Sequence, residues 1–226
     1  MTVVAFDFDG TLSDSEMTVL LGEQCDTVEQ SPTSDSATRD SVADRMDEIT
    51  ERAMNDEIAY AESLRRRCAL LDGLADADAR AAFDQVRLRP GAAAIIRDLR
   101  AAGVHVAVLT GGFERGVEAA LDAADVDVDT IVANRLPVAD GALTGEVEGP
   151  LIEGMKDDAL AVLAAALDEE LVDTVAVGDG ATDLPMLDVA GLAVGFAPKP
   201  AVEPACDVVV GSVDAVRDVL GHEGLL

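Results

Sequence analysis

The stretch Val3-Val4-Ala5-Phe6-Asp7-Phe8-Asp9-Gly10-Thr11 decides the fold, because an apolar run leads directly into two aspartates. Four apolar and mostly strand-favouring residues predict a buried parallel strand that ends where the aspartates begin. In open α/β sheets, ligands bind at that edge. Asp7 and Asp9 can then take different roles, one as nucleophile or metal ligand and the other as proton donor, if a divalent cation neutralises their repulsion.

Two other kinds of structure contain a D-x-D pair. An EF-hand calcium loop needs Gly at its sixth position and Glu at its twelfth, and here those positions hold Leu12 and Thr18. This mismatch excludes a calcium loop. A pair of aspartates in a surface turn is the remaining alternative, and the motifs further along the chain disfavour it.

The chain is strongly acidic. Its 226 residues include 45 acidic and 16 basic ones, the net charge is −29, and Lys156 and Lys199 are the only lysines. Self-repulsion of this size destabilises a compact chain unless salt screens it. Because the acidic residues are spread along the chain, we predict adaptation to molar salt rather than an acidic binding tail. Repulsion from phosphate backbones and anionic lipids argues against nucleic acid and membrane partners.

Length and composition predict a protein with a sizeable core. With 49% hydrophobic residues, the chain can form one large domain or a core with a modest second domain. The three cysteines are far apart and odd in number, which is typical of reduced thiols in a cytoplasm. The sequence shows neither a basic leader nor a long uncharged run, so we expect a cytoplasmic monomer or homodimer.

Short apolar runs alternate with helix-compatible stretches. The predicted strands are Val3–Phe6, Val104–Leu109, Thr130–Ala133, Thr174–Val177, Leu192–Val194 and Asp207–Val210. The predicted helices are Ala92–Ala102, Glu114–Ala124, Lys156–Leu167, Asp183–Val189 and Val213–Leu220. This alternation indicates an α/β fold with a Rossmann-like, doubly wound parallel sheet covered on both faces. Pro137–Glu148, with Asp140-Gly141 at its centre, predicts a hairpin flap.

The interval from about Asp14 to Arg87 lacks any strand-like run. Val42–Asn55 and Ile58–Leu71 are predicted helices, whereas the polar stretch Glu23–Ala43 predicts an irregular or mobile segment. The first helix has apolar residues at the helical spacing that is typical of a core face, namely Met46, Ile49, Ala53 and Met54. We therefore expect a helical cap, residues 14–87, that covers the aspartates, and a core formed by residues 1–13 and 88–226.

Three further motifs follow strand ends or begin a helix. Thr110-Gly111-Gly112 combines a hydroxyl with accessible backbone amides, as in an anion cradle, although the same residues also form ordinary tight turns. Lys156 is retained in a chain that has almost abandoned lysine, which favours a phosphate contact over a surface position. Gly178–Asp183 ends a strand with two more acids, and hard oxygen ligands without His or Cys indicate Mg²⁺ rather than Zn²⁺.

Taken in order, these motifs resemble the haloacid dehalogenase superfamily, and within it the chain is similar to the phosphoserine phosphatases. The resemblance covers nearly the whole chain. The matching segments are Asp7-Phe8-Asp9-Gly10-Thr11-Leu12, Ser63-Leu64-Arg65-Arg66-Arg67, Gly111-Gly112-Phe113, Ala133-Asn134-Arg135-Leu136, Leu143–Gly149 and Val175–Asp179.

The resemblance implies a magnesium-dependent phosphomonoesterase that works through an aspartyl-phosphate, hydrolysing L-phosphoserine in serine biosynthesis. Asp7 would attack phosphorus and bind the metal. Asp9 would protonate the leaving alcohol and later activate water, and its backbone carbonyl would reach the metal. Asp179 would complete the protein ligands, and Asp183 would order the waters on the metal.

The resemblance also assigns the residues that hold the substrate. Thr110, the Gly111 amide and Lys156 would hold the phosphate oxygens. Thr110 replaces the usual Ser and keeps the hydroxyl, whereas Thr182 replaces the usual Asn, so its phosphate contact becomes a hydroxyl contact or is lost. The residues that would bind the serine part are Glu16 for the ammonium, Arg67 for the carboxylate, and Met54 and Tyr60 as pocket lining.

Three alternatives stay open. Arg67 can belong to a solvated helical face beside Arg65 and Arg66. A phosphatase for a sugar phosphate, glycerol phosphate or other small metabolite would not need Glu16 and Arg67 as a clamp for both charges. A receiver-type phospho-acceptor module also joins strand-end acids to a hydroxyl and a lysine, but it is shorter and has no helical insertion.

Overall fold

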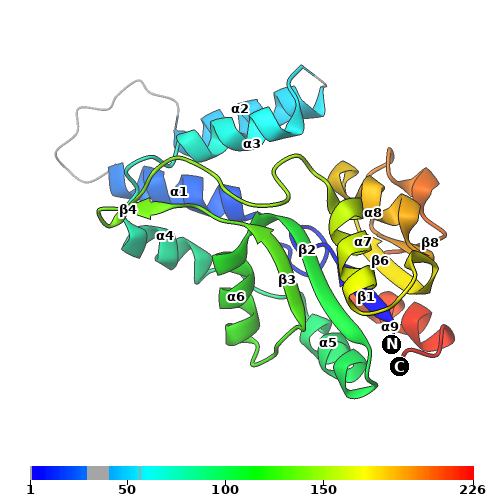
Figure 1. Ribbon diagram of the computed structural model, residues 1–226. Coiled ribbons are helices and arrows are strands. Elements are labelled where there is room, and N and C mark those ends of the chain that lie inside the picture. The colour runs from blue at the N-terminus through cyan, green and yellow to red at the C-terminus, as the bar shows by residue number, and fades with distance from the viewer. Residues whose placement is uncertain (1, 30–40, 56) are drawn as a thin grey trace.

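The structure, a computed structural model, describes residues 2–29, 41–55 and 57–226 (Figure 1). Within these ranges, a six-stranded parallel sheet has the order β3-β2-β1-β6-β7-β8. Its strands are β1 (Val3–Phe6), β2 (His105–Phe113), β3 (Thr130–Asn134), β6 (Thr174–Gly178), β7 (Leu192–Phe196) and β8 (Val208–Val210). The chain leaves β1 for β2 on one side and later returns to β6 on the other. The carboxyl ends of β1 and β6 therefore flank the topological switch point, where α/β sheets bind ligands.

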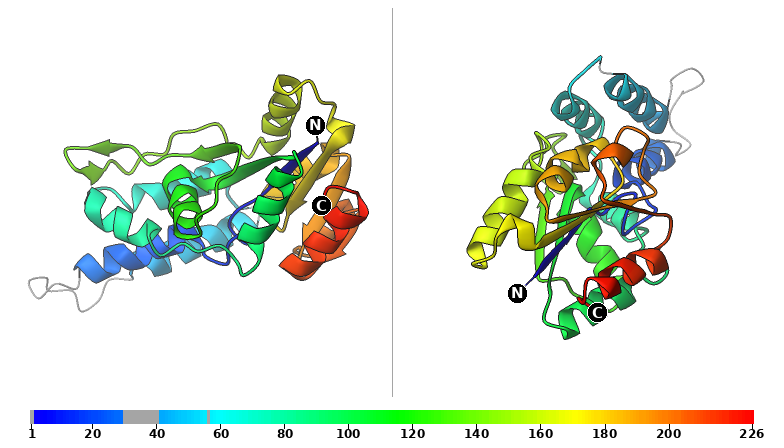
Figure 2. Two further views of the ribbon diagram at one scale, coloured as in Figure 1. Left: turned by 90° about the horizontal axis from the view of Figure 1, so that it is seen from below. Right: turned by 90° about the vertical axis from the view of Figure 1, so that its right-hand side faces the viewer.

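Helices cover both faces of this sheet (Figure 2). One face carries α5 (Ala92–Ala101), α6 (Glu114–Ala123) and α9 (Val213–His222), and the other carries α7 (Lys156–Ala166) and α8 (Leu184–Val189). Val4 and Phe6 of β1 point into the first of these cores, and Val3 and Ala5 point into the second. Burial on both faces explains why the sequence of β1 is an unbroken apolar run. The predicted doubly wound α/β fold is confirmed.

More helices lie between β1 and α5, beyond the carboxyl ends of the strands (Figures 1 and 2). They are α1 (Met17–Glu29), α2 (Val42–Met54), α3 (Tyr60–Ala69) and α4 (Asp76–Phe83). The predicted hairpin, β4 (Val138–Ala139) with β5 (Ala142–Leu143), is also present. Its turn residues Asp140 and Gly141 have φ values of 51° and 83°, as a two-residue type I′ turn requires. Backbone hydrogen bonds join the hairpin to the segment between α3 and α4, including Leu143 N to Leu74 O at 2.8 Å.

Helix α1 corrects the prediction that Glu23–Ala43 is irregular. Residues 23–29 are helical, residues 30–40 lie outside the described residues, and Ser41 caps α2 by accepting a hydrogen bond from Asp44 N. Met17, Leu21 and Cys25 recur every four residues on α1 and are all buried. Packing of this apolar stripe against the core outweighs the polar character of most positions in residues 23–29.

The core-face interpretation of Met54 is also wrong. Met46 is buried, but Met54 is 70% exposed at the last position of α2.

Two further elements differ from the prediction. Strand β2 is longer than predicted and continues to Phe113, and helix α4 is additional to the predicted helices. Buried Ala79, Ala82 and Phe83 hold α4 against the core. Within the described part of the chain, no helix is long and apolar enough to span a membrane.

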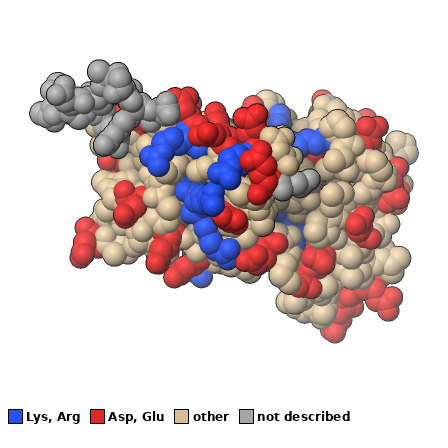
Figure 3. Space-filling view, turned by 90° about the horizontal axis from the view of Figure 1, so that it is seen from above, with Lys and Arg blue, Asp and Glu red and all other residues tan. Residues whose placement is uncertain are grey.

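The surface charge predicts a strong effect of salt on folding. On the face shown in Figure 3, acidic side chains are scattered, and basic ones gather where α2 and α3 lie. Repulsion among 45 acidic residues is screened at 1 M salt, where the Debye length is about 3 Å, but much less at 0.1 M. Dialysis to low salt should therefore unfold the chain, with partial rescue by Mg²⁺, as followed by far-ultraviolet circular dichroism. Full stability at low salt would contradict adaptation to molar salt.

Candidate active site

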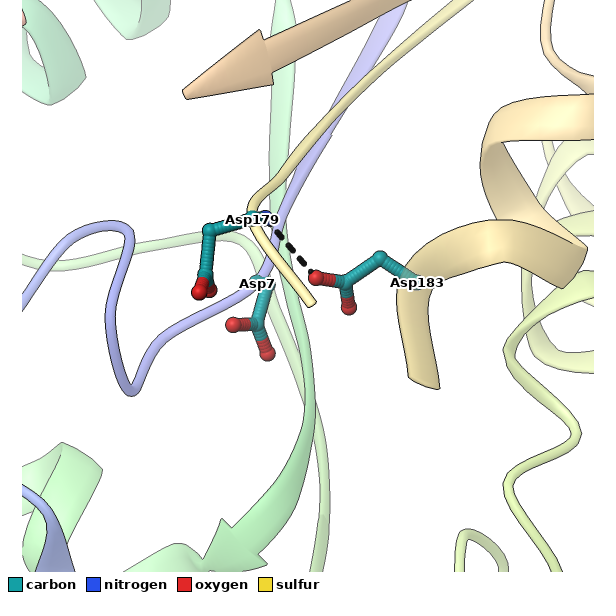
Figure 4. Close-up of side chains that lie close together, drawn as sticks. All are labelled: Asp7, Asp179 and Asp183. Atoms are coloured by element: carbon teal, nitrogen blue, oxygen red, sulfur yellow. Dashed lines mark hydrogen bonds between the residues drawn. The ribbon is translucent and has the colours of Figure 1, made fainter. Parts of the chain in front are cut away.

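Three carboxylates converge at the carboxyl ends of β1 and β6. Asp7 follows β1, Asp179 follows β6, and Asp183 lies one turn beyond Asp179 (Figure 4). One oxygen from each carboxylate lies within 4.8 Å of the other two. Gly10 has a φ of +89°, and a Cβ at this position would lie 2.5 Å from Asp179 Oδ1, so only glycine lets the turn after β1 approach this closely.

Asp183 is held by hydrogen bonds on both of its oxygens. Its Oδ2 accepts hydrogen bonds from the backbone amides of Asp179 and Gly180, each at 2.9 Å. Its Oδ1 accepts one from Lys156 Nζ at 2.5 Å. The residue is fully buried, so these contacts fix the carboxylate in one orientation.

Lys156 places a buried ammonium between two of the acids. Its Nζ lies 2.5 Å from Asp7 Oδ1 and 2.5 Å from Asp183 Oδ1, and the side chain is 1% exposed. Burial lowers the pKa of Lys156, but the carboxylates of Asp183 and Asp7 outweigh that effect and leave the pKa above its ordinary value. Lys156 is therefore charged at neutral pH.

The acids remain poorly neutralised despite this lysine. Burial, and after it the charge of Asp183, raises the pKa of Asp7 to about 7, although Lys156 opposes the rise. Burial and Asp183 also raise the pKa of Asp179. Carboxylates gathered in a buried site with raised pKa values favour an added cation. The donors are all hard oxygens, so the set fits a divalent metal ion.

Asp9 lies beside this cluster but its side chain does not join it. Its Oδ1 is buried and has no hydrogen-bond partner among the described residues. Burial first, and then the charges of Glu16 and Asp7, raise the pKa of Asp9 well above its ordinary value. A raised pKa favours the protonated form of this carboxyl group, which can donate its proton to a bound molecule.

The Thr110 hydroxyl and the two glycines after it lie at the same edge of the sheet as these aspartates. Thr110 is 1% exposed, and its Oγ1 accepts a hydrogen bond from Gly112 N at 3.0 Å. The Tyr60 hydroxyl lies 2.1 Å from the position that a Cβ on Gly111 would take, so the start of α3 closes directly over this end of β2. Asp9 Oδ2 lies 3.0 Å from the corresponding position on Gly112.

The structure places the predicted substrate residues on different elements. Arg67 lies on α3, where its Nη1 donates to Thr18 Oγ1 at 3.1 Å and its Nε is buried without a partner among the described residues. Glu16 is exposed at the start of α1, and its charge contributes to the raised pKa of Asp9. Thr182 is half-buried in the short helix Ala181–Asp183. Met54, the last residue of α2, is 70% exposed.

Sequence reasoning missed residues that support these groups. Lys199 Nζ lies 4.0 Å from Asp179 Oδ2, and the rarity of lysine that singled out Lys156 applied equally to Lys199. Arg89 donates from Nε to Thr11 O and from Nη2 to Gly10 O, each at 3.1 Å. Arg89 thereby holds the turn that follows Asp9. Asn134 lies in Ala133–Leu136, one of the segments that carry the family resemblance, but the resemblance assigns no role to it.

Comparisons with known proteins show which family the chain resembles. Residues 4–188 match the model of the family described as haloacid dehalogenase-like hydrolase. The chain is 52% identical over 225 residues to a phosphoserine phosphatase of Halobacterium salinarum (strain ATCC 29341 / DSM 671 / R1), covering 100% of both chains. It is 37% identical over 204 residues to a phosphoserine phosphatase of Lactococcus lactis subsp. lactis (strain IL1403), covering 90% of this chain and 87% of the other.

Solved structures give the same result. A substrate-bound phosphoserine phosphatase complex has a TM-score of 0.83 and 32% identity, covering 98% of this chain and 97% of the other. A phospho-aspartyl intermediate analogue of phosphoserine phosphatase has a TM-score of 0.82 and 32% identity, covering 98% of both chains. With the family model matching most of its length, the chain belongs to the haloacid dehalogenase-like hydrolase family.

Proposed function

We propose that this chain is a magnesium-dependent phosphatase that hydrolyses L-phosphoserine to L-serine and phosphate, as a cytoplasmic monomer or homodimer that serves serine biosynthesis. One observation carries the proposal. Asp7 is paired with the buried Lys156, and Asp9, two residues further on, has a raised pKa. Asp7 can therefore act as the nucleophile and Asp9 as the proton donor, both at the carboxyl end of β1. Similarity to phosphoserine phosphatases over the full chain supports the choice of substrate.

In the first step, an Asp7 carboxylate oxygen attacks the phosphorus of L-phosphoserine. Asp9 donates its proton to the serine oxygen as the bond from phosphorus to that oxygen breaks, so L-serine leaves and the phosphoryl group remains on Asp7. In the second step, water attacks the same phosphorus and the Asp9 carboxylate accepts its proton. Phosphate leaves, and both aspartates return to their starting states.

The proposed metal ligands are the carboxylates of Asp7 and Asp179 and the backbone carbonyl of Asp9, with Asp183 close enough to order the metal's waters. When bound, Mg²⁺ supplies positive charge that offsets these carboxylates and the phosphate oxygens. Burial, and after it the charge of Asp183, raises the pKa values of Asp7 and Asp179, so an added positive charge would stabilise both carboxylates, which supports this assignment. The choice of Mg²⁺ rests on the hard, all-oxygen donor set.

Proposed phosphate contacts come from Thr110, the Gly111 amide and Lys156, with Thr182 at the rim. Because Thr110 Oγ1 already accepts a hydrogen bond from Gly112 N, its own proton is free to donate to a phosphate oxygen. A loose phosphoryl transition state needs positioning and neutralised charge more than covalent help. Lys156, held between Asp7 and Asp183, is already fixed before substrate binds.

The serine part of the substrate is assigned to Glu16 and Arg67. The buried Arg67 Nε without a partner supports a role in binding an anion, because an unpaired buried donor is costly. This favours a ligand role over a purely solvated helical face. Tyr60 closes over Gly111 and fits a lining role, and the same role is proposed for Met54, which is 70% exposed.

The activity is tested on a panel of phosphorylated metabolites in molar potassium chloride. With Mg²⁺ present, L-phosphoserine should give the highest kcat/KM for phosphate release, and chelation of the metal should stop the reaction. The rival within enzymes, a phosphatase for sugar or glycerol phosphates, would show its highest kcat/KM with one of those compounds. A chain that released phosphate only once per molecule would match a phospho-acceptor module.

Variants of Glu16 and Arg67 should change selectivity in opposite ways. Wild type should prefer L-phosphoserine over phosphoethanolamine, which lacks the carboxylate, and over 3-phosphoglycerate, which lacks the ammonium. Arg67→Ala should remove most of the first preference and Glu16→Ala most of the second, each by about 10- to 100-fold in kcat/KM, because each loses one charge-assisted contact.

The control is Arg66→Ala, since Arg66 is exposed on the same helix and pairs with Glu62. It should leave the ranking of the three substrates unchanged. General damage to the helices around the site cannot produce the crossed pattern. If both test variants keep the wild-type ranking, the phosphoserine assignment is wrong while the phosphatase chemistry stands.

A further inference from the structure

Asn134 is an unassigned, fully buried amide beside the site. It is the last residue of β3, where it pairs in register with Phe113 of β2. Its exposure is 0%, whereas the other residues of β3 are partly exposed. A buried amide side chain normally has hydrogen-bond partners, and the identity of those partners indicates its role.

Both ends of this amide are used. Asn134 Nδ2 donates to Gly111 O at 3.0 Å, and Asn134 Oδ1 accepts from Leu151 N at 3.1 Å. The side chain therefore joins the last residues of β2, after Thr110, to the segment that leads into Lys156. Gly149 leaves room for it, since a Cβ there would lie 2.4 Å from Asn134 Oδ1.

The contact with Gly111 controls one peptide unit. The Gly111 carbonyl and the Gly112 N–H belong to the same planar peptide, in which they point in opposite directions. Asn134 holds the carbonyl, and the N–H donates to Thr110 Oγ1 at 3.0 Å. Glycine on both sides makes rotation of this peptide easy, so an external contact is needed to keep it in place.

We propose that Asn134 is a positioning residue for the phosphate site: by fixing the Gly111–Gly112 peptide, it turns the Thr110 hydroxyl proton toward the phosphate. This inference rests on the proposed function, since it assumes that Thr110 contacts phosphate. Asn134 itself does not touch the reacting atoms. The proposed effect passes through the Thr110 hydroxyl, so it predicts coupling between Asn134 and Thr110.

The test variant is Asn134→Asp. It has the same shape and keeps the acceptor for Leu151 N, but it replaces the donor to Gly111 O with a carboxylate oxygen. We expect the inhibition constant for inorganic phosphate to rise about 10-fold and kcat/KM to fall by a similar factor, as for the loss of one buried hydrogen bond. In a Thr110→Val background, the same change should have less than about a 2-fold effect, because the hydroxyl that it orients is gone.

Two controls keep the result interpretable. Thr174→Val removes a buried hydroxyl that donates to Leu171 O at 2.7 Å, at the amino end of β6, and should leave phosphate inhibition unchanged. If Asn134→Asp does not fold, Asn134→Ser is measured in both backgrounds, since it removes the same donor without adding charge. Thermal unfolding reports any loss of stability separately.

The outcomes are distinct. Coupling between Asn134 and Thr110 in phosphate inhibition supports the positioning role. The positioning role is overturned if the effects of the two single changes on the phosphate inhibition constant simply add in the double variant. It is also overturned if that constant is unchanged in the Asn134 variant. Inorganic phosphate is a product of every phosphomonoester hydrolysis, so the test holds even if L-phosphoserine proves not to be the substrate. Failure of the proposed function would appear instead in the wild-type protein. That protein would release no phosphate from phosphomonoesters, and added inorganic phosphate would have no effect on it.

Discussion

Asp7→Asn should lower kcat for L-phosphoserine by about 10,000-fold or more, as expected when an enzyme loses its nucleophile. An amide is a poor nucleophile, and it also supplies less charge to a metal ion. The change is nearly isosteric and removes a buried carboxylate whose pKa is raised to about 7, so loss of fold is not the expected cause. Steady-state phosphate release measures the effect.

The matched control is Asp14→Asn, an exposed acid of the same type on the segment after the first turn. It should keep the wild-type rate, and both variants should unfold near the wild-type temperature. An Asp7 variant that retains more than about 1% of the wild-type kcat would mean that another group attacks phosphorus.

Asp9→Asn should slow the reaction by about 100- to 10,000-fold, the usual range for loss of a general acid and base. Burial, and after it the charges of Glu16 and Asp7, raises the pKa of Asp9, which favours the protonated acid that the first step needs. Its proton is lost as pH rises through that raised pKa, so kcat/KM of wild type should fall on the alkaline side. The Asn variant should lack this dependence.

The leaving group gives a sharper control for Asp9. The nitrophenolate of p-nitrophenyl phosphate leaves without a proton, so Asp9→Asn should reduce kcat/KM for that substrate much less than for L-phosphoserine. The kcat values should fall for both, since water still needs a base in the second step. Equal losses of kcat/KM for the two substrates would assign Asp9 to structure rather than to proton donation.

The fold was predictable from the sequence where local pattern and burial agree. β1 is buried on both faces, so four consecutive apolar residues signalled a central parallel strand. Once the strands were placed, the convergence of Asp7, Asp179 and Asp183 followed, because the carboxyl ends of parallel strands share one edge. The hairpin was visible because Asp140-Gly141 suits a turn with two positive φ values.

The missed features depend on packing between distant segments. The second half of helix α1, residues 23–29, is rich in polar residues, and the stripe of Met17, Leu21 and Cys25 becomes decisive only when the core lies against it. Met54 has the right spacing for that face of α2, but the helix ends there and leaves it exposed. Periodicity alone does not distinguish these two cases.

The supporting contacts of the site were equally hidden. Asn134 reaches Gly111 across 23 positions of sequence, and Arg89 reaches Gly10 across 79. Neither pair has a local pattern, because each joins two segments that lie far apart in the sequence. Lys156 was found by the scarcity of lysine, but its position between Asp7 and Asp183 required the structure.

Trapping the phosphoryl group on the protein tests the central claim most directly. The enzyme is mixed with L-phosphoserine labelled on phosphorus, quenched in acid within one turnover, and digested to locate the label. Our account predicts one label on the peptide that contains Asp7, released by hydroxylamine as an acyl phosphate should be, and absent from Asp7→Asn. Turnover without any protein-bound label, or a label that resists hydroxylamine, would contradict it.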